Sequence, residues 1–339
     1  MKHRYLAYGL LIASDSVVPG LKEAPDDRPP DLSLFCTPQP NDPPDWVHAA
    51  RSLQRCLYYT LPPESNPDSA VMCAYDLGGG QFLELIYSDG CQFVIDGPGT
   101  RVWGTYSTNL DIEYLATYLA GPISGLVLRR KGIVPLHASC VELDGFAIAI
   151  CGTRGAGKST TAAALGLRGQ PVLCEDISRF CERGDGFQIF PGYPRICLWP
   201  ESVQNLMGSR DALPLITQNW DKRYLPLDGT LAQFADGPKE LAAIYVLGNR
   251  IESGNAPRID ALKPADALLA LVQNSYMNWM LDRRQRAAEF DVLSVLANRV
   301  AFREVTPHSD PTRLNTMCDL ILTDASALIT ERRSTMSRS

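Results

Sequence analysis

The chain has 339 residues, of which 45 % are hydrophobic and 21 % charged, and its formal net charge is −6. This length and this balance predict a globular protein of about two domains with a substantial buried core. The acidic balance argues against the broad basic surface that nucleic acids and anionic membranes favour, so we expect neither as a partner.

Residues 1–108 are predicted to form a β-rich N-terminal domain. The run 5–13 predicts a first strand, and the segment 22–44, rich in Pro and Asp, predicts a long loop with one short extended piece at 32–35. Three further apolar or alternating runs are separated by turn residues and predict hairpins of one antiparallel sheet: 71–75, 81–87 and 91–95. The triple glycine 78–80 predicts a hairpin turn, because neither a lysine nor a helix follows it.

Residues 109–132 are predicted to form a helical connector between two domains. Apolar residues recur at spacings of three and four between 110 and 119, and Gly-Pro at 121–122 interrupts the pattern. A second helix over 123–130 ends in three cations before Gly132. Because cations suit a helix C-terminus, they are predicted to cap the helix rather than to bind a substrate.

A hairpin is predicted to lead into a phosphate-binding loop. Asp144-Gly145 separates two apolar runs, and Asp-Gly in that position is a strong hairpin signal. The second run, 146–151, is followed by the Walker A pattern G-x-x-x-x-G-K-[ST] and then by the helix-prone run 160–165. The predicted nucleotide-binding residues are Gly152, Thr153, Arg154, Gly155, Ala156, Gly157, Lys158, Ser159 and Thr160.

The glycines of this loop let several backbone N–H groups converge on phosphate oxygens, and the following helix N-terminus adds its dipole. Lys158 is expected to reach the β- and γ-phosphates, and the Ser159 hydroxyl to contact Mg²⁺. The predicted cofactors are therefore ATP, with GTP as the open alternative, and Mg²⁺.

An acidic pair follows the loop helix and a short strand predicted at 171–174. Glu175 and Asp176 stand where a carboxylate can hold Mg²⁺ or orient a nucleophile. Since adjacent residues on an extended segment point to opposite faces unless the strand ends or bulges, the two are expected to make different contacts. The remaining predicted elements are a strand at 241–247, helices at 264–271 and 276–296, a strand at 300–305, a helix at 310–329 and a flexible polar tail at 331–339.

The start of the chain has a basic head and a short apolar body that runs directly into polar residues, so we expect no secretion signal. The ten cysteines contain no C-x-x-C pair and are predicted to be reduced thiols. Together with nucleotide chemistry, these observations predict a cytoplasmic protein.

The order of these motifs resembles the catalytic domain of bacterial HPr kinase/phosphorylase. The resemblance covers about residues 123 to 305 and rests on His137-Ala138, the hairpin, the Walker A loop, Arg168-Gly169 and Glu175-Asp176. It implies an α/β (α+β) fold with a phosphoenolpyruvate carboxykinase-like P-loop core over residues 133–330. The segments 7–10, 191–202 and 221–226 look similar to a divergent branch found in peptide-tailoring gene clusters, including lasso-peptide kinases.

This resemblance implies an ATP-dependent serine kinase whose site contains His137, Lys158, Ser159, Glu175 and Asp176. The sequence departs from the family at Thr160, where a glutamate is usual, and at Glu175, which replaces the first of two aspartates. The family's glycine-rich signature is not evident. A homo-oligomer is expected by analogy.

The roles follow from the needs of phosphoryl transfer. Lys158 and a Mg²⁺ ion held by Ser159 and an acidic residue neutralise the phosphate charge. We assign Glu175 mainly to the metal. Asp176 is assigned to the acceptor hydroxyl and is also counted as a metal ligand. His137 contacts phosphate or the acidic pair, or is a hydrogen-bonded structural residue. Lys222-Arg223 stabilises transition-state charge or is a solvated cationic turn, and Arg223 is included among the catalytic candidates.

Three functions remain open at the level of sequence. The first is a kinase for a serine in a peptide or protein, the second is a kinase for a small hydroxylated metabolite such as free serine, and the third is a nucleotide-dependent binding module. An acidic pair is not needed for binding alone, which disfavours the third. The N-terminal domain, remote in sequence from every catalytic candidate, is expected to help recognise the acceptor.

Overall fold

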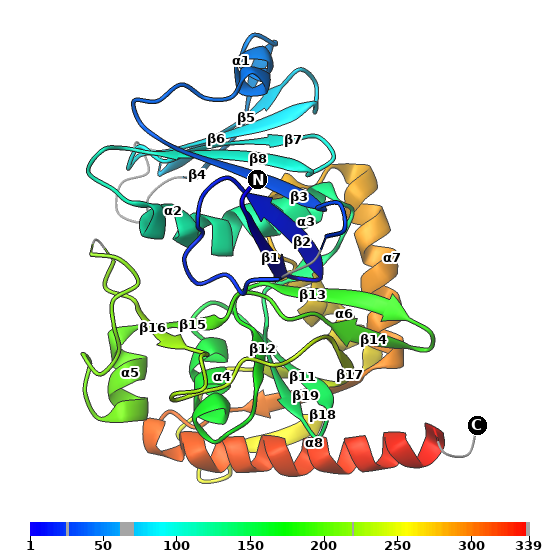
Figure 1. Cartoon of the computed structure of the whole chain (residues 1–339). Helices are drawn as coiled ribbons and strands as arrows, with labels where there is room; N and C mark the ends of the chain where they lie inside the picture. The colour runs from blue at the N-terminus through cyan, green and yellow to red at the C-terminus, as the bar shows by residue number, and fades with distance from the viewer. Residues whose placement is uncertain (25–26, 62–70, 219, 337–339) are drawn as a thin grey trace. The chain divides into compact units, whose positions relative to one another are not determined.

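Each of two units of the chain builds its own β-sheet (Figure 1). The computed structural model describes residues 1–24, 27–61, 71–218 and 220–336. By their contacts, the units are Met1–Gly132 and Ile133–Ser339. The predicted mixed α/β class is confirmed. Residues 109–132, which we expected as a separate connector, lie within the first unit.

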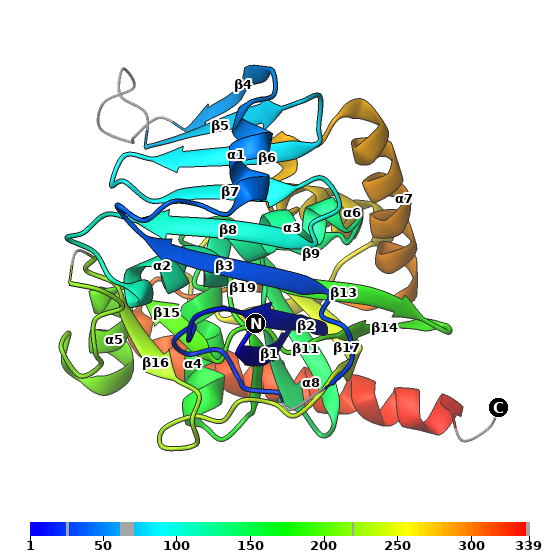
Figure 2. The same cartoon turned by 45° about the horizontal axis from the view of Figure 1, so that its top comes forward.

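In the described part of the first unit, eight strands form a sheet in the order β1-β2-β3-β8-β7-β6-β5-β4 (Figure 2). Their bounds are β1 His3–Ala7, β2 Leu10–Ser14, β3 Leu32–Pro38, β4 Arg55–Leu61, β5 Met72–Leu77, β6 Phe82–Tyr87, β7 Gln92–Asp96 and β8 Arg101–Tyr106. The predicted antiparallel hairpins of β5, β6 and β7 are confirmed. The sheet is not wholly antiparallel, however, because β3 pairs parallel to both β2 and β8.

In this unit one predicted strand was wrong and another was too short. The single strand expected at 5–13 is a hairpin, because the chain turns at Tyr8 and Gly9, whose φ angles are 54° and 69°. Tyr8 is buried and its hydroxyl donates to the carbonyl of Ala120 at 3.3 Å, so tertiary packing holds a bulky residue in a left-handed conformation. The extended piece expected at 32–35 within the 22–44 loop is confirmed, but it is longer than expected, because it forms strand β3 between β2 and β8 and extends to Pro38. Residues 25–26 of that loop lie outside the described residues.

Helices of the first unit cover both faces of its sheet. They are α1 Asp45–Arg51, α2 Ile112–Tyr118, a π-helical turn at Leu119–Ile123 and α3 Ser124–Arg130. Val47 and Ala50 of α1 pack with Val94 of β7, whereas the neighbouring residue on that strand, Phe93, contacts Tyr118 of α2. Successive strand residues face opposite sides, so α1 and α2 lie on opposite faces of the sheet.

In the described part of the second unit, nine strands form a mixed sheet whose main path is β12-β10-β11-β17-β14-β13-β9, and β19 and β18 extend it from β17. Their bounds are β9 Pro135–Leu136, β10 Ser139–Leu143, β11 Phe146–Gly152, β12 Val172–Cys174, β13 Ser178–Arg183, β14 Gly186–Ile189, β17 Lys239–Leu247, β18 Arg258–Ala261 and β19 Ala301–Thr306. A separate ribbon pairs β15 Arg195–Leu198 with β16 Arg223–Pro226. The hairpin predicted at Asp144-Gly145 is confirmed, and β11 then pairs parallel to β17.

Alternate residues of β11 pack into two different cores. Ile148 and Ile150 pack with α4 Lys158–Leu167 and α8 Leu314–Met336, and Ala147 and Ala149 pack with α6 Pro264–Gln273 and α7 Arg283–Arg299. Both sides of the strand are therefore apolar, as expected for a sheet covered by helices on both faces. This three-layer arrangement fixes the end of β11, where the glycine loop begins.

The remaining helices of the second unit differ in part from the sequence expectation. They are α5 Pro200–Met207 and short 3₁₀ turns at Asn278–Met280 and Pro311–Arg313. The helix expected to start at 276 starts at Arg283, because Met277 has a φ of 54° and Asp282 forms a capping box with Gln285. Residues 331–336, expected in a flexible tail, continue α8, and residues 337–339 lie outside the described part.

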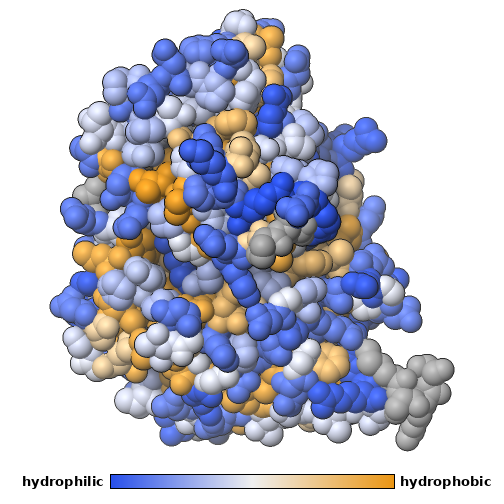
Figure 3. Space-filling view, viewed as in Figure 1, coloured by the Kyte–Doolittle hydropathy of each residue, from blue (hydrophilic) through white to orange (hydrophobic). Residues whose placement is uncertain are grey.

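The face of the molecule in Figure 3 shows hydrophilic residues interspersed with smaller hydrophobic areas. Among the helices of the described residues, none combines the length and apolar composition needed to cross a membrane.

The end of β11 predicts a sharp difference between two glycine substitutions. A Cβ at Gly152 (φ 143°) would lie 2.8 Å from the Leu247 carbonyl oxygen of β17, whereas a Cβ at Gly155 (φ 82°) would meet nothing within 4 Å. Gly155→Ala should therefore cost only backbone strain, about 1 kcal/mol. Gly152→Ala adds a backbone clash and should cost on the order of 3 kcal/mol in a denaturant unfolding experiment. Equal losses in the two variants would show that the close approach to β17 is not a constraint.

Candidate functional site

The glycine loop lies between β11 and α4, as the sequence predicts. Gly155 and Gly157 have φ angles of 82° and 111°, which side-chain-bearing residues rarely adopt, so the loop can turn back over the start of the helix. The backbone N–H of Gly152 donates to Oδ1 of Asn274 at 3.0 Å in a buried position. Asn274 directly follows α6, so a residue more than a hundred positions away fixes the start of the loop.

Lys158 is held beneath this loop. Its side chain is buried, and its Nζ donates to the carbonyl oxygens of Gly152 at 2.8 Å and Thr153 at 3.2 Å. Burial lowers the pKa of this ammonium from its ordinary value, while the nearby acidic side chains oppose the shift. A buried cation next to the backbone N–H groups of a helix N-terminus is well placed to attract phosphate oxygens.

The acidic pair stands at the end of β12, and both side chains enter the same cavity. The strand ends at Cys174, the N–H of Ile177 donates to the carbonyl of Glu175 at 2.8 Å, and Asp176 has a φ of 65°. This left-handed turn removes the opposite-face geometry of a regular strand. The two carboxylates nevertheless have different partners, as we expected.

Glu175 contacts the first turn of α4. Its Oε1 accepts a hydrogen bond from Ser159 Oγ at 2.6 Å, and its Oε2 accepts one from the backbone N–H of Cys197 at 3.4 Å. Burial, followed by the charge of Asp176, raises the pKa of Glu175 above its ordinary value. The hydroxyl and the carboxylate place oxygen atoms together, and such oxygens are the ligands that Mg²⁺ prefers.

Asp176 contacts His137 instead. Its Oδ1 lies 3.0 Å from His137 Nε2, and its Oδ2 accepts a hydrogen bond from the Tyr276 hydroxyl at 3.5 Å. Burial raises the pKa of Asp176, but the hydrogen bond and charge of His137, with Lys222 and Lys158, outweigh it and lower the pKa overall. Both side chains of the His137 and Asp176 pair remain partly exposed, at 38 % and 40 %, so the pair is accessible from the cavity.

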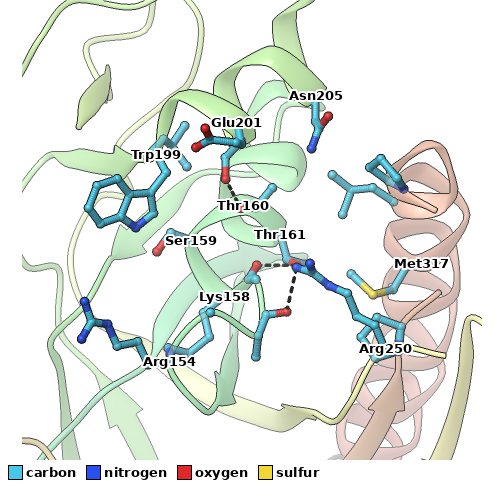
Figure 4. A pocket seen from close by; sticks show the side chains of 18 of the residues that line it. Arg154, Lys158, Ser159, Thr160, Thr161, Trp199, Glu201, Asn205, Arg250 and Met317 are labelled. Carbon is cyan, nitrogen blue, oxygen red and sulfur yellow. Dashed lines mark hydrogen bonds between the residues drawn. The ribbon is translucent and has the colours of Figure 1, made fainter. Parts of the chain in front are cut away.

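These groups line one cavity of about 540 Å³ (Figure 4). Of the residues predicted from the sequence, it contains His137, Arg154, Gly155, Ala156, Gly157, Lys158, Ser159, Thr160, Glu175 and Asp176. Gly152 and Thr153 contribute through the carbonyls that hold Lys158. The Thr160 hydroxyl shares a hydrogen bond of 2.8 Å with Ser202 Oγ of α5.

Arg223 is not among the residues that line this cavity. It begins β16, and its guanidinium contacts Asp211 and the carbonyl of Leu213. The neighbouring Lys222 lines the cavity instead, with its Nζ 5.0 Å from the centre of the Trp199 ring. Adjacent residues at the start of a strand point in different directions, and the sequence alone does not show which of two adjacent cations faces the site.

Several cavity residues were not predicted from the sequence. They are Thr161, Cys197, Leu198, Trp199, Glu201, Ser202, Asn205, Arg250, Pro307, His308, Ser309, Asp310, Pro311, Arg313, Leu314 and Met317. Arg250 follows β17, and its Nη2 donates to the carbonyl of Ala156 at 3.4 Å. The available sequence signal was a cation three residues after a buried strand, because parallel strands such as β11 and β17 end at the same edge of a sheet.

Within the described residues, no group of three or more His, Cys, Asp or Glu side chains forms a metal-binding cluster. Ser159 Oγ and Glu175 Oε1 supply two adjacent oxygens. This donor set fits Mg²⁺ bound chiefly through substrate phosphates and water, and does not fit an all-protein cage.

All ten cysteines are free thiols, as predicted. Burial raises the pKa of the Cys197 thiol beside Glu175 to about 12, so this thiol stays protonated at neutral pH.

Comparisons with known proteins identify no family for this chain. No family model matches the sequence, and no curated protein matches it. Among solved structures, the chain is similar to the Hpr(Ser) kinase/phosphatase from Coxiella burnetii, with 13 % sequence identity, a TM-score of 0.31, and coverage of 60 % of this chain and 98 % of that chain. The likeness to peptide-tailoring kinases stays a prediction.

The His137 contact predicts a measurable shift at Asp176. His137→Ala removes the hydrogen bond and charge that lower the pKa of the Asp176 carboxyl, so that pKa should rise. A pH titration of the carboxyl ¹³C chemical shifts would measure it. Tyr276→Phe removes the hydroxyl whose hydrogen bond to Oδ2 is long, at 3.5 Å, and should change the pKa of Asp176 much less. A pKa of Asp176 that stays unchanged in His137→Ala would assign His137 a purely packing role.

Proposed function

We propose that the chain is an ATP-dependent kinase that transfers a phosphoryl group to a serine hydroxyl of a peptide or protein. The observation that carries this proposal is the joining of three features in one cavity. These are the glycine loop with its buried Lys158, the Ser159 and Glu175 oxygen pair, and the Asp176 carboxylate held by His137. Phosphoryl transfer needs these three functions together: phosphate binding, metal placement and orientation of a nucleophile.

The loop binds phosphate through its backbone and through Lys158. The glycine conformations let N–H groups face the cavity, and α4 adds the positive end of its dipole. Lys158 exchanges its bonds to two carbonyl oxygens for phosphate oxygens. Because the burial that lowers its pKa disfavours the charged form, an anionic ligand should restore full protonation.

Ser159 and Glu175 are the residues that would hold Mg²⁺. The metal supplies charge neutralisation at the β- and γ-phosphate oxygens. Ser159 offers a hydroxyl oxygen, and Glu175 offers its carboxylate once the hydrogen bond between them is exchanged for metal contacts. The raised pKa of Glu175 means that this carboxylate becomes protonated at a higher pH than an ordinary carboxyl does. A protonated carboxyl binds metal weakly, so the Mg²⁺ concentration needed for half-maximal activity should rise as the pH falls.

Asp176 orients the acceptor hydroxyl and accepts its proton as the hydroxyl oxygen bonds to the γ-phosphorus, while the bond from the γ-phosphorus to the β,γ-bridging oxygen breaks and ADP leaves with that oxygen. Its lowered pKa keeps it ionised at neutral pH, which suits hydrogen-bond acceptance from a hydroxyl more than strong basicity. His137 holds the carboxylate through Oδ1. The other oxygen, Oδ2, accepts a long hydrogen bond from Tyr276, and in this proposal it also accepts the hydrogen bond of the acceptor hydroxyl. His137 is thus a positioning residue in this proposal.

The acceptor is proposed to be an extended peptide or a protein segment, for example a precursor of the lasso type. Support comes from the sequence resemblance and from the first unit, a separate compact unit that we propose recognises the polymeric acceptor. Incubation with γ-labelled ATP and either serine-containing peptides or free serine separates the acceptors. Transfer to free serine alone would replace the peptide acceptor by a small metabolite.

Replacing Lys158 tests the phosphate loop. Lys158→Ala should reduce the transfer rate at least about 100-fold, because it removes a charge directed at the transferring group. The removed side chain is buried, so circular dichroism melting must first show a folded variant. Turnover equal to that of wild type would exclude catalysis at this loop.

The acidic pair predicts two different phenotypes. Asp176→Asn keeps the shape of the side chain, so ATP affinity should stay near wild type while transfer is lost. Glu175→Gln should weaken the response to Mg²⁺ and be partly rescued by excess metal. ATP binding, Mg²⁺ titration and phosphate transfer are measured on both variants. Rescue of Asp176→Asn by metal, with a dead Glu175→Gln, would reverse the two roles.

A further inference from the structure

The cavity has two chemically different ends on either side of the phosphate loop. At one end, the N–H of Cys197 donates to Glu175, and Lys222 stands 5.0 Å from the ring of Trp199. At the other end, Arg250 contacts the carbonyl of Ala156 at the loop. Figure 4 shows Trp199 and Met317 on opposite sides, with Ser159 and Thr160 between them.

We propose that the nucleoside of the bound nucleotide lies at the end formed by Asn205 of α5, Leu314 and Met317 of α8, and the segment 307–310 before it. This inference rests on the proposed kinase function. The γ-phosphate must lie beside Asp176 and Glu175 if they orient the acceptor and hold the metal. A triphosphate laid over the loop from that end places its α-phosphate and nucleoside at the opposite end.

The walls of this end suit a purine. Met317 is buried at 5 % exposure, Leu314 is partly buried against the same core, and Pro307 is buried beside them. Binding sites for flat heterocycles combine apolar walls with a few polar groups that fix orientation. The apolar side chains here come from α8 and the segment before it, and α5 faces them across the cavity (Figure 4).

Asn205 supplies the polar group at this end. Its exposed side chain faces the cavity from α5 (Figure 4). A carboxamide offers both a donor and an acceptor, which matches the edge of an adenine ring. His308 also lines the cavity, and its ring is held by a hydrogen bond of 2.9 Å that its Nδ1 accepts from the N–H of Asp310. Its ring can therefore face a base without changing that contact.

The experiment compares ATP with inorganic tripolyphosphate, which has the phosphates without the nucleoside. Calorimetric titration of the full-length protein with Mg²⁺ measures both affinities in wild type, Asn205→Ala and Leu314→Asn. Both substitutions are uncharged, so phosphate attraction is preserved. We expect each variant to lose ATP affinity on the order of 10-fold, with tripolyphosphate affinity unchanged. Trp199→Ala at the opposite end is the matched control: because it lies at the phosphate end beside Lys222, any change should affect ATP and tripolyphosphate affinity equally.

The outcomes separate this inference from the function on which it depends. If wild type binds neither ATP nor tripolyphosphate, the kinase proposal fails and this inference fails with it. If wild type binds both but Asn205→Ala and Leu314→Asn, shown to be folded by thermal melting, keep wild-type ATP affinity, the nucleoside lies elsewhere and only this inference is overturned. A selective loss of ATP affinity in Trp199→Ala would reverse the orientation of the nucleotide.

Discussion

The close approach of Gly152 to β17 is the constraint on which the candidate site depends. β11 pairs with β17 along its whole length, and the last pair in the register is Gly152 with Leu247. Only a residue without a Cβ fits there, and its φ of 143° directs the chain out of the sheet and into the loop. The same exit places the carbonyls of Gly152 and Thr153 over Lys158. Because β11 packs into a core on each face, the starting point of the loop is held from both sides of the sheet.

Two adjacent carboxylates at this edge acquire different chemistry from their surroundings. Glu175 lies against a neutral hydroxyl and a backbone N–H, and burial raises its pKa. Asp176 is partly exposed to the cavity, and although desolvation opposes it, the histidine and lysine charges around Asp176 lower its pKa. Pairs of acidic groups with opposed shifts are common where one carboxylate is needed in a different role from its neighbour. The turn at Asp176 is what brings each carboxylate to a different partner within one cavity.

Local signals in the sequence predicted the glycine loop and the acidic pair, but not the other residues that line the cavity. The strand, loop and helix around Lys158 follow from glycine spacing and apolar runs, and the acidic pair follows from its place after the next strand. Arg250, Leu314 and Asn205 come from segments that only the tertiary fold brings to the loop, and none carries a motif. Lys222 and Arg223 are adjacent in the sequence, and because neighbouring residues at the start of β16 point in different directions, only Lys222 lines the cavity. In the first unit, a buried Tyr8 in a left-handed turn looks in the sequence like the middle of a strand.

The left-handed backbone at Asp176 also limits how this position can change during evolution. Aspartate, asparagine and glycine adopt a φ of 65° more readily than β-branched side chains, which adopt it only at considerable cost. Two separate constraints therefore act on a mutation of this aspartate: the loss of the carboxylate and the positive φ that the new residue must adopt. Relatives without the proposed transfer activity are expected to carry asparagine or glycine here more often than valine or isoleucine. Sequences of inactive relatives with valine or isoleucine at this position would show that the turn itself is dispensable.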